Sequence, residues 1–489
     1  MKSNRLNLCM LCVFLLSMFF SAYSKSKASR PNIVFVLCDD LGYGDVQCLN
    51  PERGKIATPH IDRLASEGMI FTDAHAGASV CSPTRYGLLT GRYSWRSRLQ
   101  KGVVQGFKPC LIAPERPTVA SFLKDQGYQT AIVGKWHLDF QYINPETGDT
   151  LKRHGKVPAP IGSIIPDGPI TRGFDSYLGF HHAADMESVI QNDRIIEYDP
   201  PINMLPRITN AAVNYIDNHA KDTDEPFFLY VAFSSPHTPI VPSPEWQGKS
   251  NINPYADFVM QTDASFGAIL DALEKNNLDN NTLVIFSSDN GCSKAANFKQ
   301  LQKFGHYPSA YMRGSKSDIW DGGHRIPFIA RWPQMIKAGS SSDQMVCLTD
   351  FFATCADILN QDIPESSCED SYSFLPALKG GAVERQSVIH HSISGHFAFR
   401  MGKWKLCLAK GSGGWSSPKE QETEEGCPIA QLYDLETDPG ETNNLYDTHP
   451  DVVEHLLQLL EEDVERGRST PGPKSENDVN NIVLWKSGK

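Results

Sequence analysis

The chain has 489 residues, of which 40% are hydrophobic and 21% are charged, which is the composition of a globular protein with a large core and more than one domain or subdomain. The formal net charge of −11 argues against nucleic acid or an anionic membrane surface as a dominant electrostatic partner. An anionic substrate therefore needs a local cationic pocket.

The N-terminal residues are typical of an export signal. Lys2 and Arg5 precede an apolar run over residues 6–20, and small residues at 22–24 offer a cleavage site. The run is short for a membrane-spanning helix, and no later stretch has the length of one. We therefore predict a signal peptide at 1–24 and an exported protein, periplasmic or secreted, with no stable membrane span after cleavage. A retained membrane anchor is the alternative.

The ten cysteines after this segment are spread along the chain without the CxxC pairs of a metal site. Setting aside Cys81, which has an unusual neighbourhood, leaves nine, and an odd number cannot all pair internally. Export permits some disulfides, but their connectivity cannot be deduced from the sequence.

The first predicted strand is the apolar run 33–38, which has the pattern of a strand buried on both faces. It ends at Asp39 and Asp40. Adjacent carboxylates repel each other and are costly to bury without a counter-ion, so a cation is the natural remedy. A solvated turn is the alternative.

A short helix is predicted next to Cys81. Ser82 can cap it, Pro83 suits its first turn, and Gly91 offers a stop signal. Cys81 would then lie at the mouth of the helix, where free backbone N–H groups and the macrodipole favour anions. Arg85, four residues on, lies over the same face. A buried structural cysteine beside a surface helix is the alternative.

Three further predicted strands, at 131–133, 227–233 and 283–286, also end in polar groups. Helices are predicted before and between them, and strands that alternate with helices predict a mainly parallel, right-handed α/β sheet. Such sheets bind ligands beyond the carboxyl ends of their strands. The polar groups at these three ends are Lys135 and His137, then His237, then Asp289 and Asn290.

Two regions without clear periodicity are expected to line the same pocket. Between residues 140 and 206 the pattern weakens into a Pro/Gly-rich insertion, which we interpret as a wall that sets specificity. A second, glycine-rich stretch contains Lys316 and leads into a strand at 328–330. For Lys316, and for His181 and His182 in the insertion, an ordinary loop position is the alternative.

From about residue 368 the pattern changes to short antiparallel strands at 397–401, 403–407 and 431–435, followed by a helix at 451–466 and a polar, flexible tail. We therefore predict an α/β fold with a large, mainly parallel sheet flanked by helices and a smaller C-terminal α+β subdomain built on an antiparallel sheet. The predicted boundaries are 29–367 for the catalytic domain and 368–489 for the C-terminal subdomain with its helix and polar tail.

Together these motifs resemble the formylglycine-dependent sulfatase family, an arylsulfatase-like family of the alkaline phosphatase superfamily. The resemblance runs from residue 31 to residue 439 and covers nearly the whole mature chain. Its most specific part resembles the signature in which a cysteine is oxidised to Cα-formylglycine, and consists of Cys81-Ser82-Pro83-Thr84-Arg85 with Thr90-Gly91-Arg92. The motifs at 39–40, 134–137, 235–239, 288–291 and 314–316 stand in the family's order.

The resemblance implies a sulfatase that hydrolyses sulfate esters through a formylglycine hydrate at position 81 and a covalent sulfate intermediate. It also implies one calcium ion per subunit. Three carboxylates and an amide carbonyl suit a hard cation, although the sequence does not exclude magnesium. The implied metal ligands are Asp39, Asp40, Asp289, Asn290 and the modified Cys81.

The resemblance further implies a role for each catalytic residue. One hydroxyl of the hydrate attacks the sulfur with Asp289 as base, while three cations neutralise the sulfate oxygens. His237, assisted by Lys316, protonates the departing alcohol, and His137 takes the proton of the second hydroxyl so that elimination releases the sulfate. The implied catalytic residues are Cys81, Arg85, Lys135, His137, His237, Asp289 and Lys316.

The expected substrate is a sulfated carbohydrate, such as a glycosaminoglycan or another glycan fragment, with an amino-sugar 6-sulfate as one candidate. A formylglycine-generating maturation enzyme is the second implied partner. Some relatives carry a serine hydroxyl in the pocket, and here the nearest polar groups differ. The candidates for holding the rest of the substrate are His181, His182, Asp185, Arg98 and Lys101.

Three other functions remain open from the sequence. A phosphoesterase or phosphonate hydrolase of the same superfamily is one, because phosphate and sulfate esters share a tetrahedral shape. A hydrolase that uses the Cys81 thiolate is another, since a helix end can lower the pKa of a thiol. A protein that binds sulfated glycans without cleaving them would result if Cys81 stayed unmodified.

Overall fold

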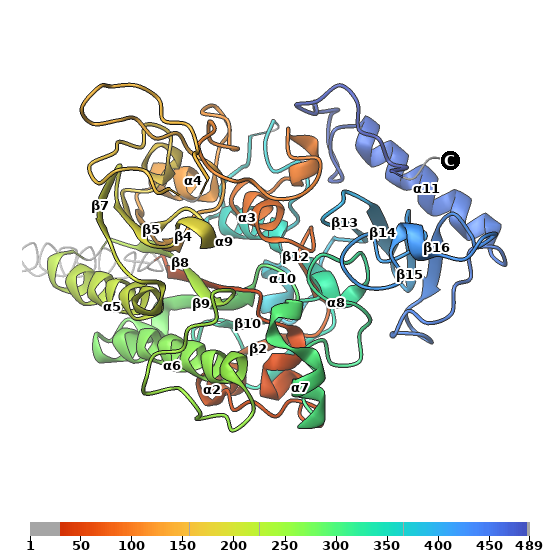
Figure 1. The fold of residues 1–489 in the computed structure, drawn as a ribbon, viewed down its shortest axis with the longest axis horizontal. Coiled ribbons are helices and arrows are strands. Elements are labelled where there is room, and N and C mark those ends of the chain that lie inside the picture. The colour runs from red at the N-terminus through yellow and green to blue at the C-terminus, as the bar shows by residue number, and fades with distance from the viewer. Residues whose placement is uncertain (1–29, 156, 224, 365, 487–489) are drawn as a thin grey trace, which may run out of the picture. The chain divides into compact units, whose positions relative to one another are not determined.

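The computed structural model describes residues 30–155, 157–223, 225–364 and 366–486 (Figure 1). The predicted signal peptide at 1–24 lies outside these residues. Residues 32–489 belong to one structural unit, and the boundary between 367 and 368 stays a prediction. Among the helices of the described residues, none has the length and apolar character needed to cross a membrane. All ten cysteines of the described residues are free, so the disulfides that export permits are not formed there.

The main element of the unit is a mixed, mainly parallel sheet, as predicted. Its central strands β9, β1, β8, β4 and β5 run parallel to one another, whereas β10 and β6 are antiparallel to both of their neighbours. In order across the described sheet, the strands are β11 (Ser340–Ser342), β2 (Met69–Phe71), β10 (Phe328–Arg331), β9 (Thr282–Ser288), β1 (Asn32–Asp39), β8 (Phe227–Pro236), β4 (Gln129–Lys135), β5 (Ser176–Phe180), β6 (Ser188–Gln191) and β7 (Arg194–Tyr198).

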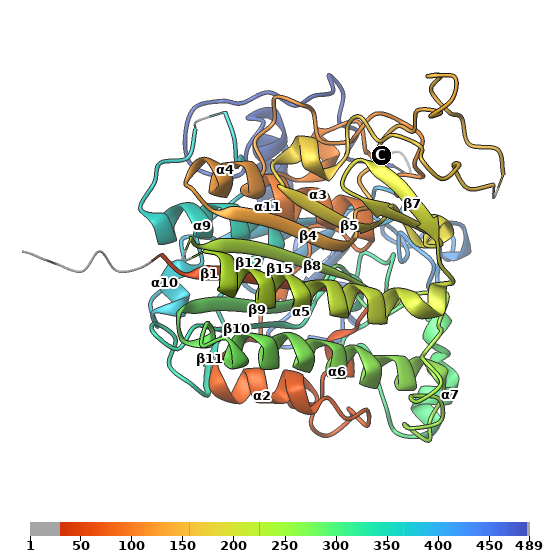
Figure 2. The ribbon, with the colours of Figure 1, turned by 90° about the vertical axis from the view of Figure 1, so that its left-hand side faces the viewer.

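Helices cover both faces of this sheet, with α2 and α6 on one side and α4 and α9 on the other (Figure 2). The alternation of side chains along β1 explains the two layers. Ile33, Phe35 and Leu37 belong to the core that includes α4 and α9, whereas Val34 and Val36 belong to the core that includes α2, α5 and α6. The helices are α2 (Pro59–Glu67), α3 (Cys81–Thr90), α4 (Val119–Asp125), α5 (Met204–Asp222), α6 (Pro254–Lys275), α7 (Phe298–Lys303), α8 (Asp321–His324), α9 (Phe351–Leu359), α10 (Leu375–Leu378) and α11 (Pro450–Glu465).

A separate four-stranded antiparallel sheet follows in the C-terminal part of the chain, with α11 packed against it. Its strands are β13 (Ser387–His391), β14 (Phe397–Met401), β15 (Trp404–Cys407) and β16 (Gln431–Asp434). Three of these strands and α11 were predicted, whereas β13 was not. A two-stranded sheet of β3 (Ala74–His75) and β12 (Val346–Cys347) lies elsewhere in the unit.

Residues 140–206 contain strands that the sequence pattern did not predict, while the role of this stretch as a wall that sets specificity stays a prediction. Its strand β5 pairs in parallel with β4 and so extends the main sheet, and β6 and β7 continue it. These strands are only four or five residues long and expose part of their length, so they lack the continuous apolar run that marks a central strand.

The helix at Cys81 begins two residues earlier than predicted, at Cys81 and not at Pro83. Cys81 is the first residue of α3, Val80 is the N-cap, and no side chain caps the helix. Ser82 is therefore not the cap, and its Oγ instead accepts a hydrogen bond from the backbone N–H of Val104 at 3.2 Å. The predicted stop is confirmed, because Gly91 ends the helix in the left-handed conformation with φ of 65°.

The prediction of a flexible tail after residue 469 is wrong for its first part. Arg92 and Arg96, which follow α3 and are buried, bind this segment through Asp478 Oδ2, the Glu476 carbonyl and Asn477 Oδ1. The Asp478 N–H also donates to the Arg96 carbonyl at 2.8 Å. Two arginines that need buried partners thus hold a polar segment whose composition alone indicates disorder.

Gly134 in β4 provides a test of the sheet next to the polar strand end. Its φ is 111°, and a Cβ at this position would overlap the Ala232 carbonyl oxygen of β8. We expect Gly134→Ala to lower the free energy of unfolding by more than about 3 kcal/mol, measured by chemical denaturation. Gly148→Ala is the control, because φ is 75° there but open space surrounds it, so its cost should be about 1 kcal/mol. Equal losses in the two variants would contradict the role of the close approach.

Candidate active site

The four polar strand ends meet because β9, β1, β8 and β4 are neighbours in the sheet. Parallel strands place their carboxyl ends along one edge, which gathers Asp39 and Asp40, Lys135, His237, and Asp289 and Asn290. The N-terminus of α3 and the loop after α7 add Cys81 and Lys316. All the predicted catalytic and metal-binding residues except His237 are buried, and the side chain of His237 is 16% exposed.

Cys81 lies between a carboxylate and a cation of this cluster. Its Sγ is 3.5 Å from Oδ1 of Asp39 and 3.5 Å from Nζ of Lys316. Burial, and next the charge of Asp289, raise the pKa of the Cys81 thiol to about 12, although Lys135 and Lys316 oppose the shift. The thiol is therefore protonated at neutral pH, which argues against a hydrolase that uses a Cys81 thiolate.

Three cations bind the three carboxylates. Arg85 donates from Nε and Nη2 to Oδ2 of Asp289 at 3.0 and 2.7 Å, and Lys135 Nζ is 2.7 Å from Oδ2 of Asp39. Lys316 Nζ binds Oδ1 of Asp40. Burial would lower the pKa of Lys316, but the charges of Asp40, Asp39 and Asp289 act together with Cys81 to outweigh burial and raise this pKa, so Lys316 stays protonated.

The carboxylates differ in their electrostatic balance. Burial alone would raise the pKa of Asp39, but Lys135, His237 and Arg85 outweigh it and hold the pKa well below its usual range. At Asp289 the effect of burial is the largest and raises the pKa to about 6. The charge of Arg85 opposes this shift, whereas the charge of Asp39 adds to it. Of the two carboxylates, Asp289 is thus the better proton acceptor near neutral pH.

The donor set around Asp40 fits a hard cation. Asn290 donates from Nδ2 to Oδ1 of Asp40 at 2.8 Å, while its own Oδ1 is buried and has no hydrogen-bond partner in the described part of the chain. An unpaired buried amide oxygen is costly unless a ligand satisfies it. Asp40 has a left-handed backbone with φ of 67°, and its N–H donates to Asp289 Oδ1 at 3.2 Å, which fixes the turn. Asp39, Asp40, Cys81 and His237 also lie close enough to share an ion.

The two candidate proton-transfer histidines have different surroundings. His137 hydrogen-bonds through Nε2 to the Val104 carbonyl at 3.1 Å, which assigns the proton to Nε2 and leaves a lone pair on the unpartnered Nδ1. Burial, and then the charge of Lys135, lower the pKa of His137 well below its usual value. His237 Nε2 lies 3.7 Å from Asp40 Oδ2; burial lowers its pKa, and the charges of Asp39 and Asp40 oppose that shift.

Three of the substrate-binding candidates lie beside His137. The rings of His181 and His182 are 5.8 and 5.4 Å from the His137 ring, and His182 Nδ1 is 3.1 Å from Asp185 Oδ2. His181 is fully buried, and its Nε2 accepts a hydrogen bond from the Asp139 N–H. His181 therefore supports the neighbouring backbone and is not exposed to a substrate.

The other two candidates lie on the segment that follows α3. Arg98 Nη2 is 3.1 Å from Asp139 Oδ2. Because the Asp139 N–H donates to His181, Arg98 is connected to the histidines at 181 and 182 only indirectly, through Asp139. Lys101 is exposed and lies beside Gly395 of the C-terminal region.

Sequence reasoning missed two residues of this group. Arg153 binds Asp185, lies over the ring of Phe107 and has a buried Nε without a partner. It belongs to the irregular stretch, where no periodicity marks it. Asp139 accepts from the Gly106 N–H at 2.7 Å and has a φ of 60°. Its position two residues after His137, in a polar strand end, was the available signal.

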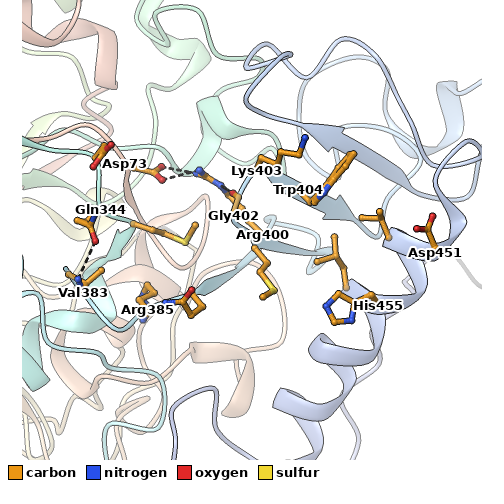
Figure 3. Close-up of a pocket in the computed structure, with 16 residues that line it drawn as sticks. Asp73, Gln344, Val383, Arg385, Arg400, Gly402, Lys403, Trp404, Asp451 and His455 are labelled. Carbon is orange, nitrogen blue, oxygen red and sulfur yellow. Dashed lines mark hydrogen bonds and ion pairs between the residues drawn. The ribbon is translucent and has the colours of Figure 1, made fainter.

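A pocket of about 850 Å³ lies elsewhere and is lined by the turn between β14 and β15, the first half of α11, Asp73 and the segments 343–345 and 383–386 (Figure 3). Its described lining contains none of the predicted catalytic residues. Arg400 in this pocket binds Asp73, and Arg385 binds Asp350, so both guanidinium groups already have carboxylate partners. Because the described lining of this pocket contains none of Cys81, His137 and His237, we do not assign the predicted site to it.

Comparisons with known proteins identify the family of the chain. The family model "Sulfatase" matches residues 31–361, and the model "N-sulphoglucosamine sulphohydrolase, C-terminal" matches residues 315–469. The N-acetylgalactosamine-6-O-sulfatase of Bacteroides thetaiotaomicron is 32% identical, over 89% of this chain and 93% of its own. Human arylsulfatase A is 29% identical, over 88% of this chain and 87% of its own.

A solved structure supports the same assignment. This structure comes from work on the metabolism of multiple glycosaminoglycans by Bacteroides thetaiotaomicron. It superimposes on this chain with a TM-score of 0.77 at 30% identity, and the match covers 89% of this chain and 99% of its own. The signature helix, the clustered strand ends and the extent of these matches lead to one conclusion. The chain belongs to the sulfatase family of the alkaline phosphatase superfamily and is a sulfuric ester hydrolase.

Proposed function

We propose that this sulfatase is an exported enzyme, periplasmic or secreted, that hydrolyses sulfate esters of a carbohydrate through a formylglycine hydrate at position 81. The position of Cys81 carries the proposal. It starts a helix, is 2% exposed, and lies among three cations and three carboxylates as a thiol with a pKa of about 12. A protonated thiol is a poor nucleophile there, whereas a hydrated aldehyde offers two hydroxyls.

Asp39, Asp40, Asp289 and Asn290 would hold one calcium ion, together with an oxygen of the modified residue 81. The unpartnered Oδ1 of Asn290 and the three carboxylates support this choice, since calcium prefers several oxygen ligands. When bound, the ion would supply positive charge that favours a deprotonated hydroxyl at position 81.

The residues around position 81 then have separate tasks. Asp289, which lies among the groups around position 81, takes the proton of the attacking hydroxyl. Arg85, Lys135 and Lys316 surround the sulfate oxygens and stabilise the charge that builds in the transition state. His237, the partly exposed member of the cluster, donates a proton to the departing alcohol oxygen with the assistance of Lys316.

Release of the covalent sulfate is assigned to His137. Its Nε2 is occupied by the Val104 carbonyl and its Nδ1 has a free lone pair, so Nδ1 is the atom that takes the proton of the second hydroxyl. The bond from this hydroxyl oxygen to carbon becomes a C=O bond as the C–O bond to sulfate breaks. Elimination therefore regenerates the aldehyde, and water then restores the hydrate.

An amino-sugar 6-sulfate is the substrate that the similarity favours, because the relative at 32% identity is an N-acetylgalactosamine-6-O-sulfatase. His182 and Asp185 beside His137 would bind the sugar, with His181, Arg98 and Lys101 in supporting or outer positions. A formylglycine-generating maturation enzyme would act on Cys81. The catalytic domain would comprise residues 29–367 and the C-terminal subdomain residues 368–489.

One experiment tests the proposal on protein from a host with the maturation enzyme. Mass spectrometry of the tryptic peptide that contains residue 81 should show an aldehyde in place of the thiol. In parallel assays, an aryl sulfate should be turned over much faster than the matching aryl phosphate, and N-acetylgalactosamine 6-sulfate should release sulfate. An intact thiol in active protein would contradict the mechanism. Activity on the aryl sulfate with none on the sugar sulfate would contradict only the substrate.

A further inference from the structure

Asp318, two residues after Lys316, is a fully buried carboxylate with an unusual set of partners. Among the described residues, every hydrogen bond to it comes from a neutral donor. Its Oδ1 accepts from the N–H groups of Trp415 and Ser416 at 2.9 and 3.0 Å. Its Oδ2 accepts from the Ser315 N–H at 2.9 Å and from the Ser416 hydroxyl. One side chain thus joins the segment of Lys316 to a loop of the C-terminal sheet.

This loop, residues 411–416 between β15 and β16, packs closely against the Lys316 segment. The Ser412 carbonyl accepts from the Ile319 N–H at 2.8 Å, and the Trp415 N–H also reaches the Ser317 hydroxyl at 3.0 Å. A Cβ at Gly414 would overlap the Ser317 carbonyl oxygen, so only glycine permits this approach. The loop therefore supports the backbone on both sides of Asp318.

The other face of the segment is attached to the catalytic cluster. The Lys316 N–H donates to the Cys292 carbonyl at 2.9 Å, and the Ser317 N–H donates to the Ser79 carbonyl at 2.8 Å. Ser317 has a left-handed backbone with φ of 84°, which a non-glycine residue adopts only when its surroundings hold it. The Lys316 side chain continues to Asp40 and ends 3.5 Å from Cys81.

We propose that Asp318 is a positioning residue that fixes Lys316 by binding the C-terminal loop 411–416 to its backbone. The proposal rests on the proposed role of Lys316 in stabilising the sulfate in the transition state. Through Asp318, a loop of the C-terminal sheet sets the position of Lys316, whose side chain lies at the edge of the main sheet.

A carboxylate is required at position 318 because both of its oxygens accept backbone N–H bonds. In Asp318→Asn, the amide NH₂ must face either the donors of Trp415 and Ser416 or the donor of Ser315. One side then loses its acceptor and leaves buried N–H groups unpaired, which moves the segment. Displacement of a catalytic group by about 1 Å lowers a rate by roughly 100-fold.

The test compares Asp318→Asn with a matched control on the same loop. We expect kcat for an activated aryl sulfate to fall roughly 10- to 100-fold in Asp318→Asn, with a much smaller change in KM. Glu420→Gln is the control, because Glu420 also accepts two backbone N–H bonds, from Lys410 and Gly411 at 3.0 and 2.9 Å, and none of these three residues bonds to Asp318 among the described contacts. It should lower the melting temperature and leave kcat within about twofold.

A double-mutant cycle with Lys316→Ala separates this proposal from the proposed function. If Asp318 acts through Lys316, Asp318→Asn should have little further effect on kcat once Lys316 is replaced. Full additivity, or a fall in kcat no larger than that of Glu420→Gln, would overturn the positioning role. An unchanged kcat in Lys316→Ala alone would instead overturn the role of Lys316 and the proposal with it.

If Asp318→Asn does not fold, Ser416→Ala tests the positioning role of Asp318 instead. This variant removes one hydroxyl donor and leaves the carboxylate and its backbone partners in place. It should lower kcat by roughly two- to tenfold in the otherwise unchanged enzyme and have no effect in the Lys316→Ala background. The same fall in both backgrounds would contradict the proposal.

Discussion

Replacing Cys81 by alanine should reduce turnover of a sulfate ester by roughly 10⁴-fold or more without unfolding the protein. The variant removes the thiol that conversion to formylglycine requires, so no hydrate and no attacking hydroxyl form at position 81. Within the described residues the Sγ makes two polar contacts, both at 3.5 Å, so the stability cost should be about 1 kcal/mol. Steady-state kinetics and the melting temperature measure the two effects.

Cys81→Ser sharpens this prediction because it supplies one hydroxyl instead of two. Serine can accept the sulfate but has no second hydroxyl from which elimination can start. We therefore expect a burst of at most one equivalent of alcohol, followed by a stalled enzyme whose residue 81 carries sulfate, detectable by mass spectrometry. Cys355→Ala, at a fully buried cysteine of α9, is the control and should keep normal turnover. Sustained multiple turnover by Cys81→Ser would rule out the elimination step.

Arg85→Ala should lower the free energy of unfolding by about 3–5 kcal/mol when calcium is absent. Arg85 and Asp289 are both fully buried, and loss of the guanidinium leaves the Asp289 carboxylate without its nearest cation. Added calcium should reduce this loss, because an ion among the carboxylates would replace part of the missing charge. Turnover should fall roughly 10²- to 10³-fold through loss of a sulfate-binding cation.

Arg63→Ala is the matched control for this destabilisation. Arg63 also forms an ion pair, with Glu67 at 2.8 Å, but its side chain is 33% exposed. Solvent-exposed pairs contribute little, so this variant should cost less than about 1 kcal/mol and leave turnover unchanged. Chemical denaturation with and without calcium compares the two variants. A cost in Arg85→Ala no larger than in Arg63→Ala would contradict the electrostatic account of the cluster.

The strand ends show how far sequence reasoning reached into the site. Asp39, Lys135, His237 and Asp289 each follow an apolar run, and parallel strands that are neighbours in a sheet bring such ends together. The gathering of these residues was therefore predictable from a local pattern and one topological rule. Their partners were not, because the pairing of Arg85 with Asp289 joins residues 204 positions apart.

The errors have a related origin. The tail at 469–478 has the composition of a flexible segment, yet buried arginines after α3 bind it, and composition does not record a partner elsewhere in the chain. Ser82 has the right residue type for a cap, but its hydroxyl is used by the Val104 N–H. Each prediction used a local preference, and a tertiary contact decided the outcome.

By itself, the sequence determined the α/β class, the order of the motifs and the resemblance to sulfatases, because apolar periodicity and short motifs are local properties of the chain. Only the tertiary structure decided which carboxylate carries the raised pKa, which nitrogen of His137 is free and how the C-terminal loop reaches Asp318. These features depend on distances and burial between segments far apart in the sequence. A hydrogen bond or a charge interaction acts over a few ångströms in space, and no local pattern encodes that proximity.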